Sequence, residues 1–285
     1  MIAPMDTANP EITTRDEINA ELIRLLDNRQ ALYDLSSELI MLDYRPEFAK
    51  LHRRGSRSLG AGLKGASLLD SLGHLFVYVH MAWETGILNT LHSCRRQGVT
   101  RAQLLDVFMA GQLTGGPRGA ENIYRAVWMM LRDYRDRPEP PEFPDGWAAD
   151  DGAFRCGLDL STPDLTEPDL RAITDWYERT IGYVPRSVTF AAEYHPRFLK
   201  NYRAKWEGAF RGGLPKQMLP YMTLRYCTIN GFREGIRENA LLGKAWGMRR
   251  EYVVHAVASS AYYMNGLPAV SVAADALSDV LKEWA

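Results

Sequence analysis

The chain is poor in cysteine, and its few cysteines are scattered. Cys94, Cys156 and Cys227 are the only three among 285 residues, and no two of them have C-x-x-C spacing. An odd and sparse set argues against a disulfide framework and is typical of a reducing compartment. The N-terminal residues also lack a basic segment followed by an apolar core, so no signal peptide is expected. We therefore expect a cytoplasmic protein.

The chain also lacks an excess of either charge and any long apolar run. Lys and Arg number 34, against 35 Asp and Glu. Nucleic-acid-binding domains usually show a basic excess or stripe, so nucleic acid is not an expected partner. No run approaches the 18 or so apolar residues that a membrane span needs, so no membrane partner is expected either. With 46% hydrophobic and 24% charged residues, the composition is that of an ordinary globular protein.

Apolar residues recur with the spacing of a helix. Between residues 17 and 33, one helical face carries Ile18, Leu22, Leu25, Leu26 and Leu32. A second such stretch follows Thr100, a suitable N-cap, and stops at Gly115. Alternating strand patterns bounded by hairpin turns are absent. The predicted fold class is all-α.

The two halves of the sequence repeat one another. The segment YRPEFAKLHR begins at Tyr44 and recurs as YHPRFLKNYR from Tyr194, an offset of 150 positions. The offset then becomes 149, as for Gly98 and Gly247. Such self-similarity predicts two copies of one structural unit.

The composition between the copies predicts a linker. Residues 136–165 are rich in Pro, Asp and Gly and show no helical period. We expect a first helical unit over residues 1–135, this linker, and a second helical unit over residues 166–285.

Several short motifs of the second copy occur in a characteristic order. They are G-x-x-P at 182–185, HPRFL at 195–199, GGLP at 212–215 and NGLP at 265–268. In this order they resemble the AhpD-like, or carboxymuconolactone decarboxylase, family. The resemblance implies two tandem AhpD-like helical units. It also implies a homo-oligomer, either a trimer of two-repeat chains or a dimer.

The redox residues of that family are missing. Its redox members carry Glu, eleven residues, and then C-x-x-C-x-x-x-H. The matching positions in the second copy are Pro220, Phe232, Gly235 and Asn239, and those in the first are Ser71, Trp83, Gly86 and Thr90. Because a thiolate performs the redox chemistry, thiol peroxidase activity is not expected. The family's decarboxylases keep a histidine near the last position, and neither copy has one there.

Charged residues at helical spacing mark the second copy. They are Arg233, Glu234, Arg237 and Glu238. Arg225 lies in the apolar stretch before them. Arginine can hold a carboxylate through two hydrogen bonds, and glutamate can transfer a proton. The run equally fits a solvated, salt-bridged helix face. The candidates are Glu234 for catalysis, with Arg225, Arg233 and Asn239 for substrate binding.

In the first copy, His80 and Glu84 are four residues apart beside Trp83, which predicts one helical turn between them. Such a pair can form a general base oriented by a carboxylate, or a hydrogen bond at the edge of the core. We take His80 and Glu84 as catalytic candidates and Trp83 as a binding candidate. His255 and Tyr262 are further binding candidates that could line the same cavity, although a structural histidine is more common. The histidines lack the close spacing of metal ligands, so neither a metal nor another cofactor is expected.

Two functions remain open from the sequence. One is a cofactor-independent lyase or hydrolase acting on a small organic acid, a lactone or an aromatic-ring breakdown product. Its site could be composite, lying between copies or between subunits. The other is a non-catalytic relative that binds a ligand or a partner protein, because both copies lack the family's site residues. A closed cavity lined by His80, Glu84 or Arg225 would favour the enzyme.

Overall fold

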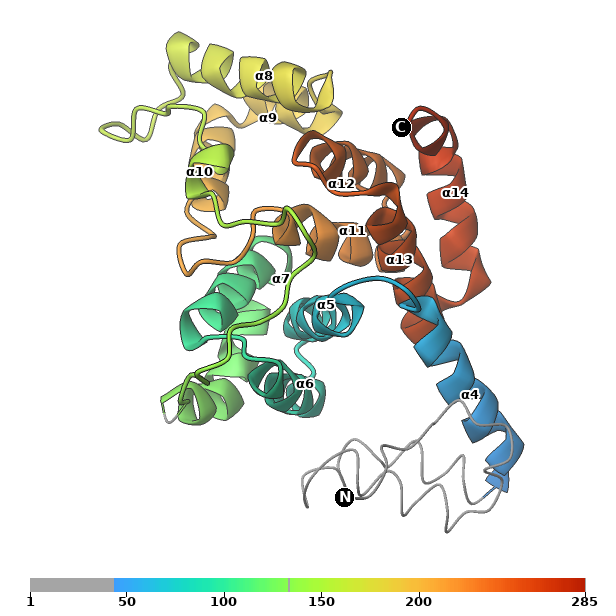
Figure 1. The fold of residues 1–285 in the computed structure, drawn as a ribbon. Coiled ribbons are helices and arrows are strands. Elements are labelled where there is room, and N and C mark those ends of the chain that lie inside the picture. Colours follow the sequence, from blue (N-terminus) through green and yellow to red (C-terminus); the bar gives the residue numbers. More distant parts are fainter. Residues whose placement is uncertain (1–43, 133, 285) are drawn as a thin grey trace.

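Helices make up the whole described architecture. The computed structural model describes residues 44–132 and 134–284, and these contain eleven α-helices, short 3₁₀ and π segments, and no strand (Figure 1). The all-α prediction is confirmed for these residues. The helix expected between residues 17 and 33 lies outside them.

The first half of the described chain consists of four helices. Its helices are α4 (Pro46–Leu59), α5 (Ala66–Met81), α6 (Glu84–Arg96) and α7 (Arg101–Arg132). Helix α5 packs against both α6 and α7. Helix α7 begins directly after Thr100, as predicted, and its backbone breaks at Gly116, where φ is 58° and ψ is −157°. The predicted stop at Gly115 lies one residue before this break. A residue with a Cβ at position 116 would be strained in this conformation.

The predicted linker is anchored in the core. It is loop apart from one short 3₁₀ turn, η1 (Asp151–Phe154). Trp147 packs edge-on against the ring of Tyr221, with ring centroids 6.2 Å apart. Phe154 is buried against Trp206, at 5.3 Å between centroids. Two aromatic side chains thus fix the path of this segment.

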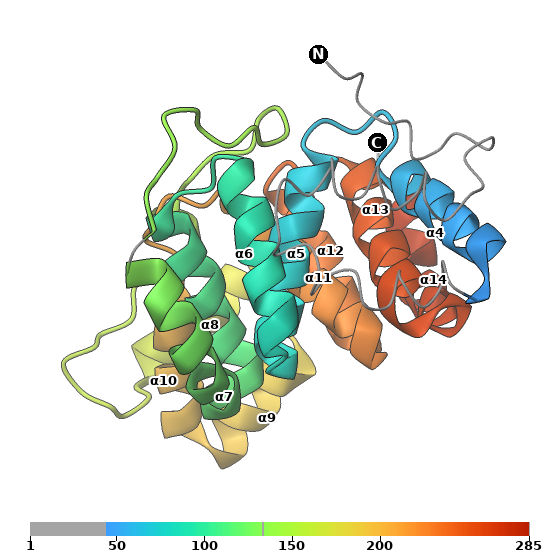
Figure 2. The same ribbon diagram turned by 90° about the horizontal axis from the view of Figure 1, so that it is seen from below.

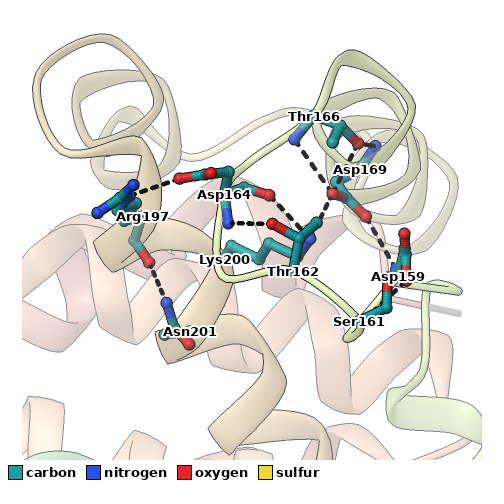
Figure 3. Close-up of polar contacts among 9 residues, drawn as sticks. All are labelled: Asp159, Ser161, Thr162, Asp164, Thr166, Asp169, Arg197, Lys200 and Asn201. Carbon is teal, nitrogen blue, oxygen red and sulfur yellow. Dashed lines mark hydrogen bonds and ion pairs between the residues drawn. The ribbon is translucent and has the colours of Figure 1, made fainter.

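The second half contains seven α-helices and a π turn. They are α8 (Glu167–Ile181), α9 (Arg186–Tyr194), α10 (Pro196–Glu207), α11 (Met218–Asn230), α12 (Arg233–Ala245), α13 (Arg250–Ser260), η2 (Ala261–Asn265) and α14 (Leu267–Lys282). The start of α8 is fixed by a capping box between Thr166 and Asp169. Lys200 of α10 lies 2.8 Å from the Asp169 carboxylate and also donates to the carbonyl of Asp164 (Figure 3). This buried ion pair joins the end of the linker to α8 and α10.

One hydrophobic core runs through both halves. It includes Leu72 and Leu104 from the first half and Met222 and Ile236 from the second. Helices α8, α9 and α10 add a smaller cluster of their own around Ile173. Figures 1 and 2 show this three-helix group at one end of the molecule and α4 at the other.

Backbone geometry repeats at offsets of 149 and 150 positions. Gly98 and Gly247, 149 positions apart, have φ of 80° and 79°. Gly116 and Gly266, 150 apart, have φ/ψ of 58°/−157° and 63°/−159°. These matches support the repeat. The division into two units stays a prediction, because a single core runs through both halves.

Candidate functional site

A pocket of about 710 Å³ lies where α9, α10, α11 and α12 meet. Helices α7 and α8 contribute one residue each to its lining. We call it the α10–α12 pocket. Its polar lining includes Arg203, Thr223, Cys227, Glu234, Glu238 and Asn239.

A tight turn places the first residues of α12 against this pocket. Helix α11 ends at Asn230, and Gly231 adopts the left-handed conformation, with φ of 67°, that caps it. Helix α12 then runs back along α11. A Cβ on Gly235 would lie 2.6 Å from the Sγ of Cys227, so any larger residue here would force the Cys227 side chain or the helix pair to shift. The pocket-facing residues of α12 are therefore held on a rigid helix pair.

Glu238 is the distinctive group of the pocket. Its side chain is half-buried, and no described residue forms a hydrogen bond or ion pair with its carboxyl group. Burial raises the pKa of Glu238 to about 7; the charge of Glu234 acts in the same direction, and that of Arg203 opposes it. A carboxyl group that titrates near neutrality can both give and take a proton.

Arg203 places a buried positive charge at the same pocket. Its Nη2 donates to the carbonyl of Phe154 at 2.7 Å, and its Nε to Glu207 at 3.3 Å. The guanidinium carbon lies 4.0 Å from the ring centroid of Trp176 and 4.4 Å from that of Trp206. The buried Nη1 has no hydrogen-bond partner among the described residues. One donor of an otherwise fixed cation is thus unsatisfied beside the pocket.

Three residues predicted for the second copy do meet at this pocket, but each is engaged. Arg233, Glu234 and Asn239 all line it. Glu234 is exposed and accepts the backbone N–H of Arg186 at 3.0 Å, at the start of α9. The amide of Asn239 donates to the carbonyl of Gly235, and Arg233 donates to a carbonyl of α14. Glu238, one turn beyond Glu234, is the acid of this pocket without a partner in the described part of the chain, and it was not among the predicted site residues.

The predicted His80–Glu84 pair is wrong. Helix α5 ends at Met81, Ala82 takes the left-handed conformation with φ of 56°, and α6 begins at Glu84. The two side chains thus belong to different helices, and no contact joins them within the described chain. Glu84 is exposed. His80 instead packs edge-on against the ring of Tyr226, 4.4 Å between centroids, and burial lowers its pKa.

His80 therefore contacts Tyr226, and Tyr226 in turn lines the α10–α12 pocket. Trp83 is the exposed N-cap residue of α6 and packs against Tyr78, with 4.7 Å between ring centroids. Neither His80 nor Trp83 lines the pocket.

Arg225 and His255 meet in a separate buried network. Arg225 lies 3.0 Å from the carboxylate of Asp70, to which Ser259 also donates at 2.6 Å. The Nδ1 of His255 lies 2.9 Å from the hydroxyl of Tyr221, and its Nε2 lies 3.5 Å from Asp70. Arg225 and His255 are 1% and 2% exposed, and Arg225, predicted to bind substrate, instead forms a buried ion pair with Asp70. The network ties α5 of the first half to α11 and α13 of the second.

Two neighbours extend this network toward α4. His74 lies on α5 one turn from Asp70, and burial together with the charge of Arg225 lowers its pKa to about 3. The ring of Tyr263 contacts His74 edge-on at 4.5 Å. Tyr262, which was expected to share a cavity with His255, instead donates to the carbonyl of His52 on α4. The polar groups thus serve the packing of the two halves.

Within the described chain, no three histidine, cysteine, aspartate or glutamate side chains lie close enough together to hold a metal ion. None of the described helices is long and apolar enough to cross a membrane. Comparisons with models of protein families, with curated proteins and with solved structures find no match for this chain.

Proposed function

We propose that the protein is a cofactor-independent enzyme, a lyase or hydrolase resembling carboxymuconolactone decarboxylase. Its substrate would be a small organic acid, a lactone or an aromatic-ring breakdown product, bound in the α10–α12 pocket. One observation carries the proposal. The carboxyl group of Glu238 has no hydrogen-bond or ion-pair partner among residues 44–132 and 134–284, and it lies in a pocket of about 710 Å³, where burial raises its pKa to about 7.

The pocket suits a small ligand that carries negative charge. Its volume lies within the range of roughly 300–1,000 Å³ typical of small-molecule sites. Arg203, which is also ion-paired with Glu207, supplies the positive charge, and its Nη1, which has no partner among the described residues, is a donor available for a ligand oxygen. The rings of Trp206 and Tyr226 supply flat apolar walls. In this proposal Arg203 attracts the acid, and Glu238 moves the proton.

The cysteine of the pocket supports a mechanism without thiol chemistry. Burial raises the pKa of Cys227 to about 12, so the thiol stays protonated at neutral pH. Because the thiolate is the reactive form, Cys227 is a poor peroxide reductant. This agrees with the loss of the C-x-x-C motif.

A thermal-shift screen against small carboxylic acids, lactones and phenolic acids tests the proposal. A ligand that binds only the folded protein raises its stability by about 2.7 kcal/mol at a hundredfold excess over Kd. We expect hits that weaken in Arg203→Lys, which keeps the charge but loses the planar fork. Turnover of a hit should fall by about a hundredfold or more in Glu238→Gln.

Glu84→Gln is the matched control, because Glu84 is exposed and lies away from the pocket. It should leave binding and turnover unchanged. A screen without any hit, or hits that bind and react equally well in Glu238→Gln, would sink the proposal.

A further inference from the structure

A stripe of exposed aromatic side chains leads out of the α10–α12 pocket. Each is between 38% and 61% exposed: Phe190, Tyr194, Phe198, Tyr202 and Phe232. We call these five residues the aromatic stripe. Contiguous apolar surface of this kind on a soluble protein commonly marks a binding site.

The stripe is continuous with the pocket wall. Phe198, Tyr202 and Phe232 themselves line the pocket. On α9, Ser187 lines the pocket, and Phe190 and Tyr194 follow it by three and seven residues, which places all three on one helical face. The rings of Phe190 and Tyr194 are 4.9 Å apart, and those of Phe198 and Tyr202 are 5.5 Å apart and stacked.

The less exposed and the more exposed parts of the pocket lining differ in character. Arg203 and Glu238 are buried or half-buried charged groups, whereas the aromatic rings are exposed and lie beside only one exposed charged pair of the lining, Arg233 and Glu234. A ligand that satisfies both parts has a polar head and an apolar tail. A small, wholly polar acid would leave the rings of the stripe in water.

We infer that the ligand is an amphiphilic acid, with its carboxyl group in the pocket and an alkyl or aryl tail lying over the aromatic stripe. The inference rests on the proposed function and narrows its substrate class. Phe190, Tyr194 and Phe198 then determine specificity for the tail, while Arg203 and Glu238 act on the head.

The repeat supplies a matched control surface. Tyr44, two residues before α4, and Phe48, on α4, stand 150 positions before Tyr194 and Phe198 and are also exposed. Helix α4 lies at the opposite end of the molecule from α9 and α10 (Figures 1 and 2). The pair Tyr44→Ser, Phe48→Ser removes similar aromatic surface far from the pocket.

The experiment measures Kd for straight-chain monocarboxylic acids of four to ten carbons, each below its micellar concentration. In the wild-type protein, each methylene that reaches the stripe should tighten Kd, by up to about fourfold where it is fully buried. The triple variant carries Phe190→Ser, Tyr194→Ser and Phe198→Ser. In this variant the dependence of Kd on chain length should flatten, while the shortest acid that binds should keep its Kd. The control pair should keep the full dependence. Circular dichroism checks that each variant is folded.

The outcomes separate this inference from the proposed function. Binding of short acids without any dependence on length overturns the amphiphilic ligand and leaves the proposed function standing. No binding of any acid, with the proposed-function screen also empty, overturns both. Sedimentation gives a third result: a wild-type oligomer that the triple variant converts to monomers would make the stripe a subunit interface and would overturn the inference.

Discussion

Glu238→Gln should stabilise the protein at alkaline pH and have little effect in acid. In the folded protein, burial raises the pKa of Glu238 from 4.5 to about 7. Between these two values the unfolded chain releases the proton and the folded chain keeps it. The unfolded state therefore binds fewer protons, and stability falls as the pH rises through this window.

The size of the effect follows from the two pKa values. A shift of this size corresponds to about 3 kcal/mol of unfolding free energy at pH 8, an upper bound because the side chain is only half-buried. Glutamine has nearly the same shape and no ionisation, so Glu238→Gln recovers this free energy while removing the proposed catalytic group. The protein should gain stability as it loses activity.

Urea denaturation at pH 5 and pH 8 measures the difference directly. We expect Glu238→Gln to exceed the wild type clearly at pH 8, and most of the gain to vanish at pH 5. Glu84→Gln, on an exposed surface, should follow the wild type at both values. An equal gain at the two pH values, or none at either, would refute the argument that burial holds the Glu238 carboxyl in its neutral form.

Three further predictions concern the packing around the site. Because the pKa of His74 is lowered to about 3 in the folded protein, the unfolded state binds more protons below about pH 6.5, and the free energy of unfolding should fall as the pH drops below that value. Urea denaturation between pH 7.5 and 5 should show a smaller fall for His74→Leu than for the wild type. Asp70→Asn leaves Arg225 buried without a counter-charge and should lower the free energy of unfolding by about 3–5 kcal/mol. In a double-mutant cycle, the addition of Arg225→Met should restore part of this lost stability. Gly235→Ala places a Cβ 2.6 Å from the Sγ of Cys227 and should lower the free energy of unfolding by about 1–3 kcal/mol. Urea denaturation should show a smaller loss when Cys227 is also replaced by alanine.

The sequence predicted most where the signal is local. Helical periodicity identified the fold class, and Thr100 and Gly115 marked the ends of the first part of α7 within one residue. These features depend on side chains and backbone groups a few residues apart, which a sequence displays directly.

The break between α5 and α6 escaped notice because its left-handed residue is Ala82 and not glycine. The repeat carried the missing signal. Ala82 lies 149 positions before Gly231, which makes the corresponding turn in the second copy with φ of 67°. Applying that offset would have separated His80 from Glu84 and removed the predicted pair.

The roles of Arg203 and Glu238 could not be predicted, because burial by distant segments creates them. Glu234 and Glu238 lie four positions apart on one helix, and nothing in the neighbouring sequence distinguishes them. Packing of α8 against α12 accompanies the burial of Glu238, whereas Glu234 stays exposed and accepts the N–H of Arg186 at the start of α9. Arg203 similarly depends on Trp176, which lies 27 positions earlier in the chain.

The two buried charge systems of the molecule differ in a way that bears on function. The Asp70 carboxylate accepts hydrogen bonds from Arg225 and Ser259. Although burial acts to raise the pKa of Asp70, His255 and Arg225 hold this pKa below the usual range, so the ionised form stabilises the fold. Glu238 has a cation nearby and yet no hydrogen bond from the described residues, and burial outweighs that cation. A neutral glutamine would fill the same space at lower cost above pH 7. Stability therefore gives no reason for an acid at position 238, whereas proton transfer in the α10–α12 pocket gives one.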